Sequence, residues 1–154
     1  MLLMLSNSLR CLNAALLFFA LLSCTTTFAQ TKLTWDIMSD VEYENKYFEE
    51  YGASYLSPTF GKGPTALNGK QVLITGYFIP LDAANQAFIL SKNPYASCYF
   101  CGNAGPETIV ELWILPKKIR RYQMDERLTF KGKLYLNQDD VNHFNYALID
   151  AEEY

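Results

Sequence analysis

The residues best suited to chemistry stand together in one short stretch, from Ser97 to Glu107. Two cysteines, Cys98 and Cys101, have C-x-x-C spacing, and a glycine directly follows the second. A Gly-Pro turn then leads to the carboxylate of Glu107, just before an apolar run. Thiols at this spacing can bind one metal ion, form a local disulfide or exchange disulfides with another protein. This stretch, called the cysteine loop below, is the first candidate site.

A zinc site is one interpretation of the cysteine loop. Two thiolates at this spacing fit one zinc ion, and the glycine after the second lets backbone amides turn toward sulfur. Structural zinc takes four ligands. His143 is the only histidine in the chain, and Glu107, or the pair Asp139 and Asp140, could complete the site. The predicted metal ligands are Cys98, Cys101, Glu107 and His143.

Two other interpretations of the cysteine pair stay open. A thiol–disulfide redox protein uses the same spacing, but its first cysteine normally opens a helix that lowers the thiol pKa. The residues after Cys98 have little helix-forming character, and no βαβ pattern surrounds them. A disulfide between Cys98 and Cys101 that pins the loop is the remaining alternative, although so small a ring gains little chain entropy.

No other motif indicates catalysis. The chain has no Gly-x-Ser-x-Gly elbow, no His-Glu-x-x-His pair and no phosphate loop. An enzyme is therefore not favoured, apart from the redox alternative.

The N-terminus predicts export. Arg10 is the only charged residue before Lys32, and the apolar run 14–22 has the length of a signal-peptide core. This run is shorter than the roughly 20 apolar residues that span a bilayer. Residues 1–29 are therefore interpreted as a signal peptide, and 30–154 as a single mature domain in the periplasm.

Lipidation is an alternative outcome of export. Residues 21–24 resemble a lipobox, in which Cys24 would be acylated and become the new N-terminus of an outer-membrane lipoprotein. Both outcomes leave Cys98 and Cys101 as the only cysteine pair of the mature chain, in an oxidising compartment. Contact with a membrane is expected only through a lipid on Cys24.

Composition and patterning predict a mostly β domain. Aromatic residues make up 15% of the chain, and rings pack well on pleated surfaces. Gly76 and Gly132 interrupt two of the strand-like runs, as glycines do where a barrel bends. A small OB-like five-stranded barrel is the predicted fold. The five predicted strands are 71–79, 87–90, 108–115, 128–136 and 146–151.

An irregular lead-in, 31–60, precedes these strands. Thr34 is placed to cap a short helix, and two irregular strands are expected to follow it. Four tyrosines recur at a spacing of four, which favours one stripe on a packed helix. Further on, 61–64 and 68–69 carry turn signals, the second of them the Asn-Gly pair typical of hairpins. The four tyrosines are Tyr43, Tyr47, Tyr51 and Tyr55.

The charge balance argues against a nucleic-acid partner. The formal net charge is -3 and the sequence pI about 5.1, whereas a nucleic-acid-binding domain normally needs a basic face. One compact basic run, 117–121, is interpreted as a solvated loop between two strands.

Several of these segments together resemble an uncharacterised family of exported bacterial proteins with a domain of unknown function, in the form found in Bacteroidetes. The resemblance covers Trp35 to the C-terminus, and the cysteine loop is its most specific part. Distant members carry a Cys-x-His pair in the loop. Cys98 matches that cysteine, while Cys101 stands one position beyond the histidine. Some relatives are associated with metal-uptake systems, so the resemblance implies metal handling. The segments that carry it are 67–72, 76–81, 97–107 and 131–134.

The sequence thus predicts an exported cell-envelope binding or accessory module of unknown ligand. Zinc, bound through Cys98 and Cys101, is the cofactor considered. The expected partner is a cell-envelope protein or a metal-uptake system. A thiol–disulfide redox protein and a structural lipoprotein with a loop-pinning disulfide are the alternatives.

Overall fold

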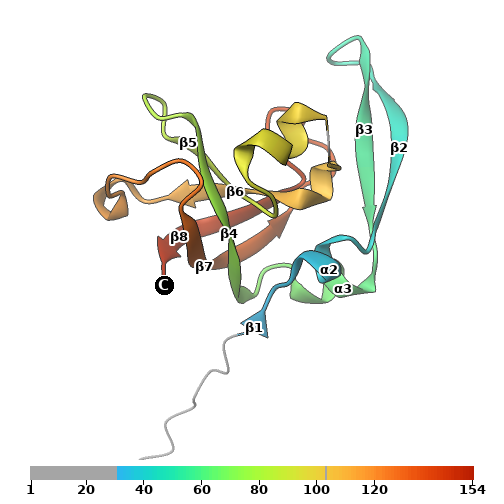
Figure 1. Cartoon of the computed structure of the whole chain (residues 1–154). Helices are drawn as coiled ribbons and strands as arrows, with labels where there is room; N and C mark the ends of the chain where they lie inside the picture. The colour runs from blue at the N-terminus through green and yellow to red at the C-terminus, as the bar shows by residue number, and fades with distance from the viewer. Residues whose placement is uncertain (1–30, 103) are drawn as a thin grey trace, which may run out of the picture.

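The computed structural model describes residues 31–102 and 104–154, which form a closed five-stranded barrel with a long hairpin beside it (Figure 1). The predicted signal peptide and the lipidation alternative at Cys24 lie outside these residues. The predicted fold class, a small and mostly β barrel, is confirmed. The barrel strands are β4 (Gln71–Asp82), β5 (Ala87–Ser91), β6 (Ile109–Ile114), β7 (Arg127–Leu136) and β8 (Tyr146–Glu153).

The order of the strands is OB-like. β4, β5 and β6 form an antiparallel meander, and β8 then pairs in parallel with β6. β7 lies between β8 and β4, antiparallel to both, which closes the sheet. The two-residue strand β1 (Thr31–Lys32) adds a short parallel pairing to β4. Closure pairs the barrel strands on both sides, so they present no long open edge to other chains.

Alternating side chains of the five strands fill the barrel, as the sequence pattern predicts. Phe78 of β4 is stacked on Tyr122, with ring centroids 4.4 Å apart, and Phe130 of β7 lies 6.2 Å from Phe78 on the same measure. Tyr146 of β8 is fully buried, and its hydroxyl donates to the carbonyl of Met38 at 2.7 Å. Aromatic rings therefore pack against one another inside the barrel.

Gly76 marks the sharpest close approach in the barrel. A Cβ at this position would lie 2.5 Å from the carbonyl oxygen of Ser91 and 2.9 Å from the ring of Trp35. Trp35 packs over the glycine, and its indole N–H donates to the carbonyl of Thr75 at 2.9 Å. Strand β4 continues past Pro80, where the sequence predicted its end, because Pro80 sits at an irregular point of the pairing with β5.

The lead-in begins with helix α2 (Trp35–Met38), and Thr34 caps it as predicted by accepting the N–H of Ile37 at 3.2 Å. The predicted turn at 61–64 was wrong, because most of it belongs to helix α3 (Lys62–Leu67). Asn68 and Gly69 do form a turn as predicted, but it does not join two strands of a hairpin. Gly69 adopts a φ of +76° and links α3 to β4, donating its N–H to the carbonyl of Leu134 at 2.8 Å.

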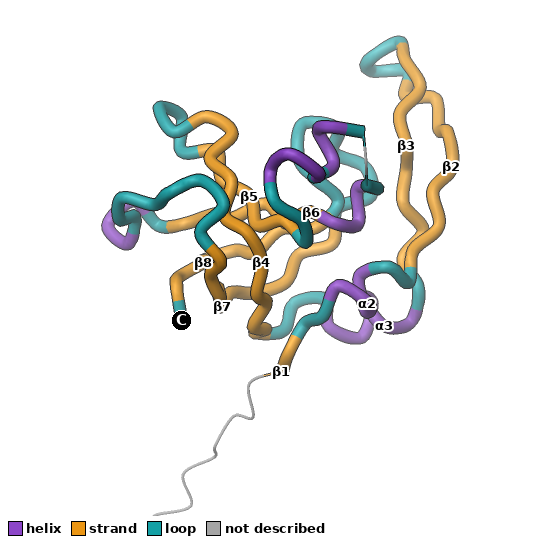
Figure 2. The backbone as a smooth tube through the Cα atoms, in the orientation of Figure 1, coloured by secondary structure: helices purple, strands orange, loops and turns teal. Residues whose placement is uncertain are grey.

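The two strands expected in the lead-in are present as β2 (Val41–Phe48) and β3 (Ala53–Phe60). They are not irregular, because they pair as a regular antiparallel hairpin. It rises beside the barrel, and the cysteine loop lies between the two in Figures 1 and 2. The tyrosine stripe on a helix was wrong as well, because those tyrosines lie on both strands and in the turn. Near the turn, the rings of Phe48, Tyr51 and Tyr55 contact one another edge to face, with centroids 6.0–6.4 Å apart.

The basic run 117–121 is held by carboxylates. It begins in the short 3-10 helix η4 (Pro116–Lys118), and Lys118 pairs with Glu152 of β8. Arg120 binds Glu126 at 2.7 Å and Glu153 at 2.6 Å, and its guanidinium lies 4.4 Å from the ring centre of Tyr122. The loop is thus fastened across the end of β8. Among the described residues, no helix is long and apolar enough to cross a membrane.

Candidate ligand groove

The cysteine loop and the residues that flank it contain three single turns of 3-10 helix: η1 (Tyr95–Ser97), η2 (Tyr99–Cys101) and η3 (Pro106–Thr108). Gly102 ends η2 with a φ of +71°, a conformation that favours glycine. The backbone N–H of Tyr95 donates to the carboxylate of Asp125 at 2.7 Å, which ties the loop to the segment before β7. The loop lies on the outside of the barrel, where it covers apolar side chains that point away from the core.

Cys98 belongs to this outer apolar cluster. It is fully buried against Ile79, Ile89 and Ile109, and its thiol forms no disulfide among the described residues. A thiol in such surroundings behaves as a small apolar side chain, which suits a packing role. The side chain of Cys101 lies outside the described part of the structure. The disulfide and redox interpretations of the pair therefore stay predictions.

Glu107 stands in the first turn of η3, and its carboxylate occupies the space that a side chain at Gly105 would need. It lies near the half-buried Tyr43 and the fully buried Tyr146. Burial is the main cause that raises the pKa of both tyrosines above the ordinary value, and the charge of Glu107 raises both further. Glu107 thus belongs to a tyrosine cluster at the base of the hairpin.

His143 lies in a different environment. Its Nδ1 is 3.0 Å and 3.2 Å from the two carboxylate oxygens of Glu111, on the outer face of β6. The same carboxylate accepts the backbone N–H of Phe144 at 3.2 Å. The ring of Trp113 is 5.1 Å from the imidazole, and that of Tyr135 is 5.9 Å from Trp113, both between centroids. His143 is therefore one end of a polar and aromatic cluster on the barrel wall.

The predicted zinc ligands thus have separate partners. Cys98 packs on isoleucines, Glu107 faces tyrosines and His143 binds Glu111. Within residues 31–154, leaving out 103 and the side chain of 101, no group of three or more His, Cys, Asp or Glu residues is placed to hold a metal ion. Because Cys101 is not included, the zinc prediction is not tested.

The structure does bring the cysteine loop and His143 to the walls of one groove of about 400 Å³. Three segments that are far apart in the sequence line it: the β2–β3 hairpin, the cysteine loop and the β7–β8 loop, residues 137–145. A volume of this size is within the range of small-molecule sites. The lining residues are Asn45, Phe48, Ser54, Tyr55, Leu56, Tyr99, Pro106, Gln138, Asp140, Val141, His143, Phe144 and Asn145.

Direct hydrogen bonds hold the hairpin against the β7–β8 loop and so fix the width of the groove. Gln138 Nε2 donates to the carbonyl of Pro58 at 3.1 Å, and the hydroxyl of Ser57 donates to the carbonyl of Gln138 at 3.3 Å. Lys46 adds an ion pair with Asp139 at 3.0 Å. Two of these contacts join strand β3 to Gln138, one through its backbone carbonyl and one through its side chain, so the two walls do not depend on surface charge alone.

The side chain of Asn137 holds the β7–β8 loop in one conformation through hydrogen bonds to its backbone. It is buried, and its side-chain N–H groups donate to the carbonyls of Asp140 at 2.6 Å and His143 at 3.1 Å. Its side-chain oxygen accepts the backbone N–H of Asp140 at 3.0 Å. Because a buried amide satisfied on both sides resists rearrangement, the loop is preorganised without a ligand.

The charge of the groove is negative. Asp140 Oδ1 accepts two hydrogen bonds from Asn142, one from the backbone N–H at 2.9 Å and one from the side chain at 3.1 Å. These bonds hold the pKa of the Asp140 carboxyl below its usual value. Asp140 is therefore ionised at neutral pH. The lining residues include no lysine and no arginine.

The sequence pattern singled out His143 as a candidate site residue. It gave no sign of the hydrogen-bond partner Glu111, of the neighbouring ring of Trp113, or of the hairpin that forms one wall of the groove. Glu111 and Trp113 have the ordinary outward positions of a strand pattern, which carry no signal of function. Only the pairing of β6 with β8 shows that they lie beneath the loop that carries His143.

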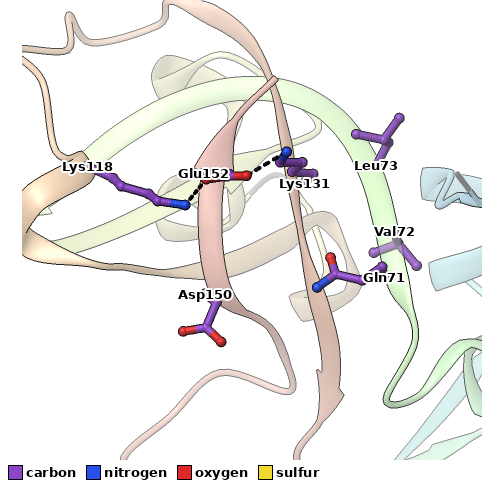
Figure 3. A pocket seen from close by; sticks show the side chains of 7 residues that line it. All are labelled: Gln71, Val72, Leu73, Lys118, Lys131, Asp150 and Glu152. Atoms are coloured by element: carbon purple, nitrogen blue, oxygen red, sulfur yellow. Dashed lines mark hydrogen bonds and ion pairs between the residues drawn. The ribbon is translucent and has the colours of Figure 1, made fainter.

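A second cavity of about 400 Å³ lies at β4, β7 and β8 (Figure 3). Both of its lysines bind one carboxylate: Lys131 Nζ lies 2.5 Å from Glu152, which also pairs with Lys118. Asp150 adds a further negative charge to the same wall. The lysines are thus already neutralised, and none of the residues that the sequence singled out as a site lines this cavity. The groove is therefore the better candidate site.

The chain was compared with protein-family models, with curated proteins and with solved structures, and it matches none of them. The case for a functional site consequently rests on the geometry described above.

Proposed function

We propose that this protein is an exported binding module of the cell envelope, and that it holds a small ligand in the groove between the hairpin, the cysteine loop and the β7–β8 loop. The observation that carries the proposal is the convergence of these three segments on one preorganised cavity of about 400 Å³. Rings and short polar side chains line it, a mixture typical of ligand sites.

The position of the groove on the barrel agrees with this proposal. OB-type barrels bind ligands on the face of their second and third strands and with the loops after their first and fourth strands. In this chain, the loop after the fourth barrel strand is the β7–β8 loop, which supplies six lining residues. The acidic net charge favours ligands other than nucleic acid.

Trp113 provides a built-in reporter for the test. It lies 5.1 Å from His143, which lines the groove, and Trp35 is the only other tryptophan of the chain. In a Trp35→Phe background, a screen of cell-wall peptides and saccharides should find a ligand that changes Trp113 emission in a saturable way. Replacing the lining side chain in Tyr55→Ala or Leu56→Ser should weaken binding by about tenfold each, since one buried contact group contributes roughly 1–2 kcal/mol.

Tyr47→Ala is the matched control. Tyr47 lies on the same hairpin, is 62% exposed and does not line the groove, so its replacement should leave the affinity unchanged. Ligands that bind the lining variants and the control equally well would contradict the groove as the binding site. So would a screen in which no compound changes the emission.

Zinc binding through the cysteine loop is tested separately on reduced protein. Mass spectrometry of protein incubated with zinc should detect one bound ion if the cysteines are ligands, and Cys98→Ser and Cys101→Ser should each abolish it. Zinc uptake that persists in both variants would contradict the prediction.

A further inference from the structure

The ligand class can be narrowed from the chemistry of the groove walls. Two kinds of group face the cavity together: aromatic rings, from Phe48, Tyr55, Tyr99 and Phe144, and an ionised carboxylate, from Asp140. Ring faces attract cations through their negative quadrupole, and a carboxylate attracts them directly. The lining holds no lysine or arginine, and its one histidine, His143, is paired with the carboxylate of Glu111, so the walls complement a positive charge.

At the rim of the groove, a lysine ammonium group already contacts both an aromatic ring and a carboxylate. The ammonium group of Lys46 lies 5.2 Å from the ring centre of Phe48 and 3.0 Å from the carboxylate of Asp139. Phe48 also lines the groove, and Asp140 follows Asp139 directly. The cavity therefore offers a second ammonium group a ring and a carboxylate much like those that bind Lys46.

The carboxylate of Asp140 is held in place for such a partner. Both hydrogen bonds from Asn142 go to the same oxygen, Oδ1. We assign the other oxygen, Oδ2, to the ligand. The bonds from Asn142 keep the carboxylate charged and limit its rotation, so little ordering cost remains when a cation binds.

The amide side chains that line the groove indicate which groups of the ligand would lie beside its cationic side chain. Asn45, Gln138 and Asn145 lie along the same walls as the rings. Amide groups of this kind pair with peptide N–H and C=O groups, while rings cover a methylene chain. A cavity of about 400 Å³ has room for one long side chain and its adjacent peptide groups.

We propose that the groove binds a short peptide through a lysine-type side chain, with the ammonium at Asp140, the methylene chain against the rings and the peptide groups at the amides. This inference rests on the proposed function, because it names the ligand class of the same groove.

Calorimetry on the full mature chain tests it with three capped tripeptides of sequence Ala-X-Ala, in which X is lysine, norleucine or glutamate. Norleucine keeps the methylene chain and lacks the charge. The lysine peptide should bind at least tenfold more tightly than the norleucine peptide, and the glutamate peptide should bind more weakly than both. Raising the salt concentration should reduce the preference for lysine.

Two variants that remove the same charge at different places test whether the preference for the lysine peptide arises at Asp140. Asp140→Asn keeps an oxygen to accept from Asn142 but removes the charge, so it should abolish the preference for lysine over norleucine. Asp150→Asn makes the same change of charge in the separate cavity of Figure 3 and should retain that preference. Thermal unfolding of both variants shows whether they are folded.

The results distinguish an error in the ligand class from an error in the location of the binding site. Equal binding of the lysine and norleucine peptides, lost in Tyr55→Ala, would overturn the lysine class and keep the groove. Binding of the lysine peptide that is unchanged in both Tyr55→Ala and Asp140→Asn would overturn the groove as well. If none of the three peptides binds, the inference is wrong, and the emission screen decides separately whether the groove takes another ligand.

Discussion

The imidazole of His143 lies 3.0 Å from the carboxylate of Glu111, and this contact fastens the β7–β8 loop to the outer face of β6. Glu111 also accepts the backbone N–H of Phe144 at 3.2 Å. One carboxylate therefore holds two consecutive residues of a loop that forms one wall of the groove.

Glu111→Ala should loosen this wall. It removes both hydrogen bonds at a partly exposed site, so the expected loss of stability is about 1 kcal/mol. The amide of Phe144 should exchange with solvent several-fold faster, as NMR hydrogen exchange can measure. Glu111→Gln keeps an oxygen for the Phe144 N–H and should protect that amide nearly as well as wild type. Equal exchange rates in wild type and Glu111→Ala would contradict this role.

Tyr146 and Tyr43 should change stability in opposite directions when each loses its hydroxyl. Tyr146 donates to Met38 at 2.7 Å, and Tyr146→Phe leaves that carbonyl without its partner, at an expected cost of about 1–2 kcal/mol. The hydroxyl of Tyr43 is buried and has no hydrogen-bond partner among the described residues. Tyr43→Phe should therefore be neutral or stabilising. Urea unfolding of the two variants measures both changes, and a destabilised Tyr43→Phe would indicate a missing partner.

Gly76→Ala should destabilise the barrel strongly. The added Cβ would meet the backbone oxygen of Ser91 at 2.5 Å and the ring of Trp35 at 2.9 Å. Ser91 cannot move without disturbing the β4–β5 pairing, and Trp35 cannot move without straining its hydrogen bond to Thr75. Overpacking of this kind costs about 1–3 kcal/mol. Thermal or urea unfolding measures it, and a change below about 0.5 kcal/mol would show that the strand relaxes freely.

Arg120 should make stability depend on pH. Its hydrogen bonds lower the pKa of Glu126 and of Glu153 in the folded protein. Lowered carboxyl pKa values contribute stability above the unfolded-state pKa, and this contribution is lost as the pH falls through the folded-state values. Wild type should therefore lose more stability than Arg120→Gln between pH 7 and the acid range below about pH 4. Urea midpoints across this range check it, and parallel curves for the two proteins would contradict it.

The barrel could be predicted from the sequence because its strands alternate cleanly. Leu128, Phe130 and Leu134 are buried in the core, as the period-two pattern of β7 predicts. The regular hairpin of the lead-in could not be predicted, because its tyrosines fit a helix and a strand equally well. Their positions were decided by the packing of Phe48, Tyr51 and Tyr55 near the hairpin turn, which no local propensity contains.

The candidate site was only partly predictable for a similar reason. Cys98 and His143 attract attention by residue type, and both lie at or next to the groove. Their surroundings depend on contacts over long sequence distances, such as Gln138 with Pro58, and a single sequence does not encode these in any local pattern.

The parallel pairing of β8 with β6 has a consequence for the order of assembly. β8 is the last strand of the chain, and the loop before it joins the hairpin at the other end of the domain through Gln138 and Pro58. The hairpin and the cysteine loop are synthesised first, but they enclose no cavity until this last strand has docked. Loss of β8 should therefore abolish the proposed ligand binding even where local structure survives, so occupancy of the groove would report that the barrel has closed.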